Sequence, residues 1–367
     1  MKWPLSHPTA PVSMRNMDQT ARTRLKQAQS QFSPEGTYLN SATHGLLTHR
    51  ARQDLERNLR EVASGRFSPG SVDGVVDAAR STYARLAGVD ADRVAVGTHT
   101  SQFVGTVAAS LPPGSEVLLA EGEFTSVVFP LMARQADGVR VREVPLERLP
   151  DEVGPSTTLV AVAAVQSATG LIAPLQDLRA ACADHGARLL LDTSQSAGWL
   201  PVPLDGVDYV VCSTYKWLLG PRGAAFLTGT DEALAALSPL APGWYAGAEP
   251  WDALYGGPLR LASGARRLDL APVWPAWIGL APGLDLLAEV GPQTVHEHDV
   301  ALADRFRDAM GLEGTGSAIV SLPVPEGTAE RLGEAGIAAA VRDGRLRVGF
   351  HLYNTDEDVD RLVSALT

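Results

Sequence analysis

The sequence predicts an α/β protein built around a mostly parallel β-sheet with helices on both faces. Seven short apolar runs, rich in β-branched residues, occur between Arg93 and Gly229, and helical stretches separate several of them. Apolar strands that alternate with helices are typical of parallel sheets covered on both sides. The expected strands are RVAVGT, EVLLA, VRVREV, TLVAVAAV, ARLLLD, DYVVCS and AAFLTG. A sheet of this kind binds its ligand beyond the carboxyl ends of its strands.

The segment before the sheet predicts an arm followed by helices. Residues 1–36 are polar and are interrupted by Pro4, Pro8 and Pro11, which indicates an arm with one short helix. Apolar residues then recur at three- and four-residue spacing over 51–64 and over 72–88. This spacing predicts two helices that each bury one face.

The segment after Pro258 predicts a second, smaller α+β domain. Its expected elements are a long helix over 277–291, a helix from about 295 to 310, a strand at 317–322, a helix at 328–336, a strand pair within 338–350 and a closing helix up to 366. Asn354 or Thr355 can cap the closing helix. We therefore expect an N-terminal arm (1–50) that contributes to the small domain and the site, a large domain (51–257) and a C-terminal small domain (258–367).

Composition and charge exclude several classes of protein. Apolar residues make up 45% and charged residues 20%, as in an ordinary globular protein. The net charge of −11 argues against nucleic acid or an anionic membrane surface as a partner. Cys182 and Cys212 are the only cysteines, and they form neither a C-x-x-C pair nor a metal-ligand pattern with histidine. With no signal-peptide core and no apolar run near ~20 residues, we expect a soluble cytoplasmic protein without a metal.

Two motifs that each follow an apolar strand carry the chemistry. LLLDTSQSAG places Asp192 and Gln195 after one strand, and VVCSTYKWLLGPRG places Ser213, Tyr215 and Lys216 after the next. Asp192 and Lys216 are 24 residues apart (216 − 192), about one helix-and-strand unit, so both side chains can reach one crevice. A desolvated lysine can attack an aldehyde, and a carboxylate can keep a pyridine nitrogen protonated, as pyridoxal phosphate (PLP) chemistry requires. A structural ion pair is the alternative.

The combined pattern D-x-x-Q-S-x-G followed by S-x-x-K-W-L-x-G-P-x-G resembles the signature of the class V aminotransferase family. The resemblance extends from about Tyr38 to the C-terminus. It implies the fold-type I architecture of PLP-dependent transferases: a large domain with a mostly parallel seven-stranded sheet and a smaller α+β domain. It also implies pyridoxal 5'-phosphate as the cofactor, held as an internal aldimine on Lys216, and a homodimer with its active sites at the interface.

The resemblance assigns the cofactor-binding residues position by position. Asp192 would pair with the pyridine nitrogen, Gln195 would contact the phenolic oxygen, and Gln166 would lie near that oxygen, where many relatives have Asn. Phe124 would stack on the ring, although a core position is the alternative for it. The phosphate would contact Ser213, Tyr215, the backbone N–H groups of Thr98 and His99 at a helix start, and Trp244 across the dimer interface. A simple helix cap is the alternative for Thr98 and His99, and a surface or interface tryptophan is the alternative for Trp244.

The resemblance also assigns substrate-binding residues. Arg347 would bind the α-carboxylate of an amino acid through its guanidinium fork, and Arg345 on the same strand face is the rival. The chain departs from many relatives by having Gly349 where they have Ser. Asn40 and His44 would line the pocket, His44 either as a proton shuttle or as an ordinary turn histidine.

The loop around residue 270 departs from the family pattern, because Pro272, Trp274 and Trp277 replace small and polar residues. This change indicates either an apolar pocket wall or a packed interface.

The reaction itself is left open by the sequence. A class V aminotransferase acting on a small amino acid is the favoured expectation, and a carbon–sulfur β-lyase like those of ergothioneine pathways, acting on an S-substituted cysteine, is the alternative. An epimerase and a non-catalytic protein of the same fold are less favoured. A persulfide-forming desulfurase is not expected, because such relatives use a mobile small-domain cysteine and no cysteine follows Cys212.

Overall fold

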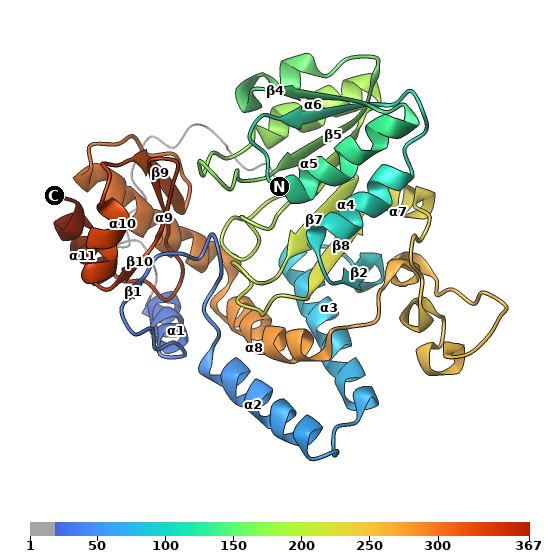
Figure 1. Ribbon diagram of the computed structural model, residues 1–367, viewed down its shortest axis with the longest axis horizontal. Coiled ribbons are helices and arrows are strands. Elements are labelled where there is room, and N and C mark those ends of the chain that lie inside the picture. The colour runs from blue at the N-terminus through green and yellow to red at the C-terminus, as the bar shows by residue number, and fades with distance from the viewer. Residues whose placement is uncertain (1–18) are drawn as a thin grey trace.

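The computed structural model describes residues 19–367 (Figure 1). The prolines at positions 4, 8 and 11, which underlie the expected arm, lie outside these residues. The expected short helix is α1 (Gln19–Gln29), and two further helices, α2 (His49–Ala63) and α3 (Asp73–Ala87), follow it. These two match the helices predicted over 51–64 and 72–88.

A seven-stranded sheet forms the centre of the large domain, as the sequence predicts. Its order is β2-β8-β7-β6-β5-β3-β4. The strands are β2 (Val94–Gly97), β3 (Glu116–Ala120), β4 (Arg140–Val144), β5 (Thr157–Ala163), β6 (Arg188–Asp192), β7 (Tyr209–Ser213) and β8 (Ala225–Gly229). Only β8 runs antiparallel to its neighbours β2 and β7. The sheet is therefore mostly parallel, and β3, β5, β6 and β7 end at the same edge.

Helices cover both faces of the sheet because its strands carry buried apolar residues on both sides. Val117 and Leu119 pack beneath α4 (Thr100–Ala109) and α5 (Thr125–Met132). Leu118 and Ala120 face the layer of α6 (Leu175–His185) on the other side. The short helix α7 (Asp231–Ala236) follows β8.

The small domain combines a three-stranded antiparallel sheet with helices. Its elements are α9 (Pro292–Ala309), β9 (Ile319–Pro323), α10 (Thr328–Glu334), β10 (Ile337–Ala338), β11 (Ala340–Arg342), β12 (Arg345–Gly349) and α11 (Asp356–Leu366). The N-terminal strand β1 (Thr37–Tyr38) pairs with β10 in parallel. Thr355 caps α11 and its N–H donates to Asp358 Oδ2 at 3.0 Å.

Helix α8 (Trp274–Val290) lies beside α2 and α3, and the small-domain helix α9 follows it directly (Figure 1). Its buried Leu280 and Leu284 join the core that contains Tyr83 of α3 and Phe226 of β8. This packing places α8 with the large domain, so we propose that the small domain begins near Pro292 and not at residue 258.

Candidate active site

A polar cavity lies where β5, β6 and β7 end, the edge at which such sheets bind ligands. Its lining residues are Thr100, Phe124, Ser126, Ala163, Ser167, Asp192, Ser194, Gln195, Ser213, Tyr215 and Lys216. The structure thus brings together six of the residues expected from sequence: Phe124, Asp192, Gln195, Ser213, Tyr215 and Lys216.

Lys216 carries the amine of this cavity and is only 6% exposed. Its Nζ lies 5.2 Å from the centre of the Phe124 ring and 5.7 Å from that of Tyr215. Burial lowers the pKa of Lys216 to about 8, and the charge of Asp192 partly opposes this shift. A substantial fraction of the amine is therefore neutral, and so nucleophilic, at mildly alkaline pH.

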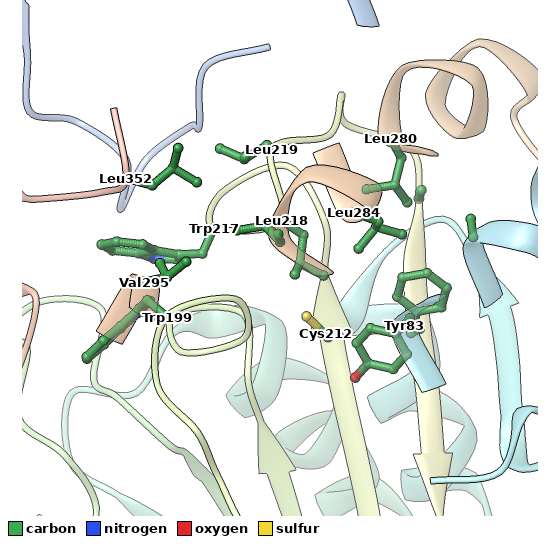
Figure 2. Packing of buried hydrophobic residues seen from close by; sticks show 14 of the residues in the cluster. Tyr83, Trp199, Cys212, Trp217, Leu218, Leu219, Leu280, Leu284, Val295 and Leu352 are labelled. Carbon is green, nitrogen blue, oxygen red and sulfur yellow. The ribbon is translucent and has the colours of Figure 1, made fainter. Parts of the chain in front are cut away.

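The backbone around Lys216 is held from outside its own loop. The carbonyl of Tyr215 accepts a hydrogen bond from the Gly45 N–H at 2.9 Å. A Cβ on Gly45 would lie 1.9 Å from the Lys216 carbonyl oxygen, so only glycine fits there. Figure 2 shows the next residues, Trp217 to Leu219, packed between helix α8 and Leu352 of the small domain.

Asp192 ends β6 and is buried beside the cavity. Its Oδ1 accepts a hydrogen bond from the Ser194 N–H at 2.8 Å. Burial raises the pKa of Asp192, while the bonds from Ser194 and the charge of Lys216 oppose the rise. A cationic ring nitrogen is the partner that would stabilise this buried carboxylate.

Three hydroxyl groups and a helix start form the other end of the cavity. Thr100 Oγ1 lies 2.5 Å from Ser213 Oγ and 3.3 Å from Ser194 Oγ. Among the described residues, no side chain caps α4, whose N-cap is His99. His99 Nδ1 instead contacts Thr98 Oγ1 at 2.8 Å. Free N–H groups with adjacent hydroxyls suit a phosphate dianion.

Thr100 and Ser194 were missed by the sequence analysis. Thr100 belongs to the turn VGTHTSQ and Ser194 to the motif DTSQ, both of which were singled out. Hydroxyl residues in these two strand-end turns were the available signal.

Gln195 has both ends of its amide engaged. Its Nε2 donates to the Ala42 carbonyl at 2.9 Å and to Ser167 Oγ at 2.8 Å, and its Oε1 accepts from Trp217 Nε1 at 2.8 Å. Gln166 lies outside the cavity lining: its Nε2 donates to the Glu121 carbonyl at 2.9 Å. The role assigned to Gln166 near the cofactor oxygen stays a prediction.

Arg347 contacts Ser167 of the cavity lining without lining the cavity itself, whereas Arg345 contacts no lining residue. Arg347 donates to the Ser167 carbonyl at 2.6 Å and to Thr43 Oγ1 at 2.8 Å, and Ser167 lines the cavity. Arg345 is exposed and bonds to Ser321 on the neighbouring strand. The contacts favour Arg347 as the carboxylate-binding residue.

His44 and Asn40 lie in the segment that follows β1. The His44 ring is 5.8 Å from the Tyr215 ring, and its Nδ1 lies 2.6 Å from the Gly45 carbonyl. Since a carbonyl only accepts, Nδ1 carries the proton and neutral His44 has its lone pair on Nε2. Asn40 bridges to Gly349, and its Oδ1 is buried without a partner among residues 19–367. Neither residue lines the cavity, so their substrate roles stay predictions.

The aromatic residues behave in three ways. Phe124 is 45% exposed and lines the cavity, so the alternative of a core position is wrong. Trp244 packs against Trp251 with ring centres 5.0 Å apart and does not line the cavity, and its expected contact with a partner subunit stays a prediction. Trp277 is buried against Phe226 in the core of its own chain, so it forms neither a pocket wall nor an interface.

The residues present fit pyridoxal phosphate. Lys216 would attach it, Asp192 would face its ring nitrogen, and Phe124 would lie against the ring. Thr100, Ser194, Ser213 and the start of α4 would hold the phosphate. Within the described residues, no cluster of His, Cys, Asp or Glu suits a metal ion.

This fold and donor set define a PLP-dependent enzyme of fold type I. The chain belongs to the class V aminotransferase family, whose model matches residues 61–320, and its cofactor is pyridoxal phosphate. It is 30% identical to an isopenicillin N epimerase of Streptomyces clavuligerus over 88% of this chain and 89% of that protein. It is 28% identical to a probable cysteine desulfurase of Aeropyrum pernix over 78% of this chain and 82% of the other.

Solved structures share the fold. The complex of the cystine C–S lyase C-DES with cysteine persulfide matches 90% of this chain and 97% of its own, with a TM-score of 0.81 and 22% identity. The cysteine desulfurase CsdA of Escherichia coli matches 93% and 97%, with a TM-score of 0.80 and 23% identity. Among the described helices, none is long and apolar enough to cross a membrane.

Proposed function

We propose that this chain is a PLP-dependent aminotransferase that acts on a small α-amino acid. One observation carries the proposal: a buried amine with a lowered pKa (Lys216) and a buried carboxylate (Asp192) line one cavity, and a guanidinium (Arg347) bonds to Ser167 of the same lining. Amine chemistry at the α-carbon of an amino acid needs these three groups.

Each group has a distinct task in this reaction. The bound cofactor supplies an electron sink for the charge that develops at the α-carbon. Arg347 binds the α-carboxylate and so orients the substrate. When its amine is not attached to the cofactor, Lys216 can act as a neutral base that removes the α-proton of the substrate. The same amine can then return this proton to C4′ of the cofactor, as transamination requires. Asp192 keeps the ring nitrogen protonated.

A carbon–sulfur β-lyase acting on an S-substituted cysteine is the second candidate. Cys182 and Cys212 are buried, and burial raises the pKa of each thiol to about 12. Neither can serve as the thiolate that accepts sulfur in a desulfurase. A lyase that releases its sulfur product needs no such thiolate, and the similarly folded C-DES is a cystine C–S lyase.

An epimerase and a non-catalytic protein are supported less well. An epimerase needs a proton donor on the face opposite Lys216, and Phe124, whose ring centre lies 5.2 Å from Lys216 Nζ, has no proton to donate. A non-catalytic protein has no need to bury a lysine amine that forms no ion pair within residues 19–367, because such burial costs stability.

A product assay separates these reactions. The PLP-loaded protein is given single L-amino acids and S-alkyl cysteines, and the visible spectrum, ammonia, pyruvate and thiol are followed. Transamination converts the cofactor to its amine form without releasing ammonia. Elimination releases thiol, pyruvate and ammonia, and the visible spectrum returns to that of the protein before substrate was added. Loss of α-chirality without either change indicates an epimerase, and no response to any substrate indicates a non-catalytic protein.

We also propose that the chain forms a cytoplasmic homodimer. Large apolar side chains are exposed on the segment that connects α7 and α8 (residues 237–273), here called the excursion: Leu240, Trp251, Leu254, Tyr255, Leu259 and Val273. An apolar surface of this kind is typical of a protein–protein interface.

A further inference from the structure

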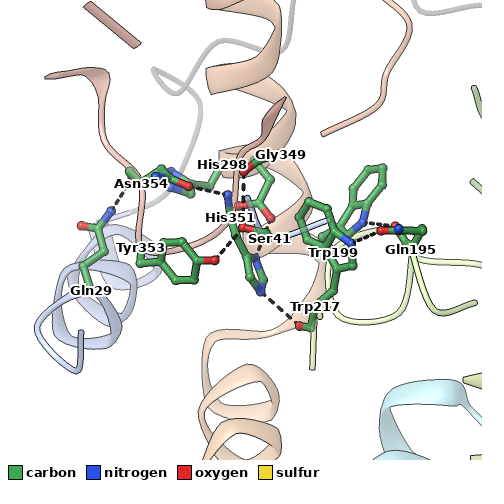
Figure 3. Close-up of polar contacts among 11 residues, drawn as sticks. Gln29, Ser41, Gln195, Trp199, Trp217, His298, Gly349, His351, Tyr353 and Asn354 are labelled. Atoms are coloured by element: carbon green, nitrogen blue, oxygen red, sulfur yellow. Dashed lines mark hydrogen bonds and ion pairs between the residues drawn. The ribbon is translucent and has the colours of Figure 1, made fainter. Parts of the chain in front are cut away.

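A buried histidine and aspartate of the small domain reach the residue that follows Lys216. His351 lies just beyond β12 and Asp299 lies on α9, and both side chains are fully buried. His351 Nδ1 is 3.0 Å from Asp299 Oδ2, and His351 Nε2 is 3.1 Å from the backbone carbonyl oxygen of Trp217 (Figure 3 shows the latter contact).

These contacts determine where the protons lie. The carbonyl of Trp217 can only accept, so His351 Nε2 carries a hydrogen. One further proton then lies between Nδ1 and Asp299 Oδ2, and the pair is neutral overall whichever atom holds it. Burial raises the pKa of Asp299 and lowers that of His351 to about 3, which favours a protonated carboxyl and a neutral imidazole. The pair thus supplies geometry to its surroundings and no net charge.

Trp217 is held at its side chain as well as its backbone. Its indole Nε1 donates to Gln195 Oε1 at 2.8 Å, and its ring packs edge-on against His351 with centres 5.1 Å apart. A Cβ on Gly349 would lie 3.3 Å from the same ring, so β12 approaches it closely. The residue after Lys216 is therefore clamped between the cavity wall and the small domain.

The same strand carries the substrate-binding candidate. Arg347 lies on β12, four residues before His351 (351 − 347), and bonds to Ser167 at the cavity. Ser167 accepts a hydrogen bond from Gln195, which is bonded to Trp217. A closed set of contacts thus links the guanidinium, the cavity wall and the backbone beside the amine.

We propose that His351, oriented by Asp299, is a positioning residue that fixes the Lys216 loop relative to Arg347. The inference rests on the proposed roles of Lys216 and Arg347 and adds the device that sets the spacing between them. His351 touches neither substrate nor cofactor; it acts through the Trp217 carbonyl.

The chain offers a matched control in His298. This residue is also buried on α9, and its Nε2 contacts the carbonyl of Asn354 at 3.1 Å. Asn354 is bonded to the backbone of His351, so His298 supports the same turn without touching Trp217. His298→Leu removes a buried imidazole from the same domain and leaves the contact between His351 and the Trp217 carbonyl in place. His351→Leu removes the contact, and Asp299→Asn keeps a donor to Nδ1 and hence the same histidine tautomer.

The first readout needs no cofactor. Lysine occurs only at positions 2, 26 and 216, so competitive acetylation of the cofactor-free protein across pH, read by peptide mass spectrometry, reports on the Lys216 amine with Lys26 as reference. Loosening the loop hydrates the amine, so His351→Leu should raise the labelling pKa of Lys216 by about half a unit or more. His298→Leu and Asp299→Asn should leave it within about 0.2 units, the reading error of such a titration.

The second readout uses the loaded protein with L-alanine and L-cysteine as probes for exchange of the α-hydrogen in D₂O. His351→Leu should lower the exchange rate about tenfold or more with a KM change under about threefold, while Asp299→Asn stays within about threefold of wild type. Equal effects of His351→Leu and His298→Leu, or no effect of His351→Leu, would overturn the proposal. If Asp299→Asn lowers the exchange rate as much as His351→Leu does, the inferred pair of a protonated Asp299 and a neutral His351 is wrong.

Failure of the proposed function and failure of the positioning role of His351 give different results. If Lys216→Ala still attaches PLP, the assignment of Lys216 is wrong. If Lys216→Ala fails to attach it while His351→Leu behaves as wild type, only the positioning role is wrong. Circular dichroism and thermal unfolding of each variant identify any that has lost its fold. If His351→Leu is lost, Asp299→Leu takes its place, because it removes the group that orients His351 and should shift both readouts in the same direction.

Discussion

Arg347 and Arg345 differ in what they touch, although the sequence places them on one strand face. Arg347 bonds to Ser167 and Thr43 at the cavity, and Arg345 bonds only to Ser321 at the surface. Arg347→Ala should raise KM for an amino-acid substrate by about 30-fold or more, because a charged hydrogen bond to the carboxylate contributes about 2 kcal/mol. Arg345→Ala is the matched control and should change KM less than about twofold. Steady-state kinetics check this pair, and equal effects would contradict the assignment.

The pKa of Lys216 predicts a pH profile for cofactor attachment. Burial lowers the pKa of Lys216 to about 8. The fraction of the amine in the reactive neutral form therefore falls about tenfold for each pH unit below 8 and approaches one above pH 8. The attachment rate, followed by absorbance after mixing with PLP, should rise up to pH 8 and then level off. A rate that still rises to pH 10, as for an ordinary lysine, would show that the amine is hydrated in solution.

The sequence predicted several of the residues that meet at the cavity, and it predicted their surroundings less well. Asp192, Gln195 and Lys216 were predictable because they follow apolar strands whose ends share one sheet edge. Thr100 could not be singled out among the polar residues of its turn, because its contact with Ser213 joins segments 113 residues apart. The prediction for Trp277, a pocket wall or an interface, was wrong. A tryptophan in an exposed loop and a tryptophan that points from a helix into the protein core cannot be told apart by residue type.

The N-terminus of helix α4 is the proposed phosphate site, and a change at its N-cap residue tests this proposal. The N-cap, His99, has extended backbone and gives no side-chain cap, and the Gln102 N–H donates to the His99 carbonyl at 3.2 Å. Within the described part of the chain, the N–H groups of Thr100 and Ser101 are therefore left for an anion. His99→Asp would supply a capping carboxylate, which should stabilise the cofactor-free protein by about 1 kcal/mol. The same negative charge should weaken PLP binding by about tenfold or more.

His99→Gln is the control for this change, since it alters the side chain without adding charge. Thermal unfolding of the cofactor-free protein and a fluorescence titration with PLP give the two quantities. Unchanged PLP affinity in His99→Asp would show that the phosphate binds elsewhere.

The elements themselves were largely predictable, whereas their division between the two domains stays a proposal. All seven strands of the central sheet and the closing small-domain elements lie where apolar periodicity predicted them. The apolar face of α8 suits either domain in sequence, and its packing against Tyr83 and Phe226 supports the proposed place in the large domain.

For the whole molecule, the exposed apolar excursion before α8 predicts a dimer. Tyr255 is 88% exposed and Leu259 75% exposed, which is unfavourable unless another surface covers them. Tyr255→Glu combined with Leu259→Arg should shift the protein toward monomer in sedimentation velocity. Glu357→Arg on α11, far from this excursion in sequence, should not. A monomeric wild-type protein would contradict the prediction.

The central claim is that Lys216 is the amine that holds pyridoxal phosphate. The direct test is borohydride reduction of the PLP-loaded protein followed by peptide mass spectrometry, with Lys2 and Lys26 as the only other lysines. We predict the reduced adduct on Lys216 alone and none in Lys216→Ala. An adduct on Lys2 or Lys26, or one that persists in Lys216→Ala, would contradict it.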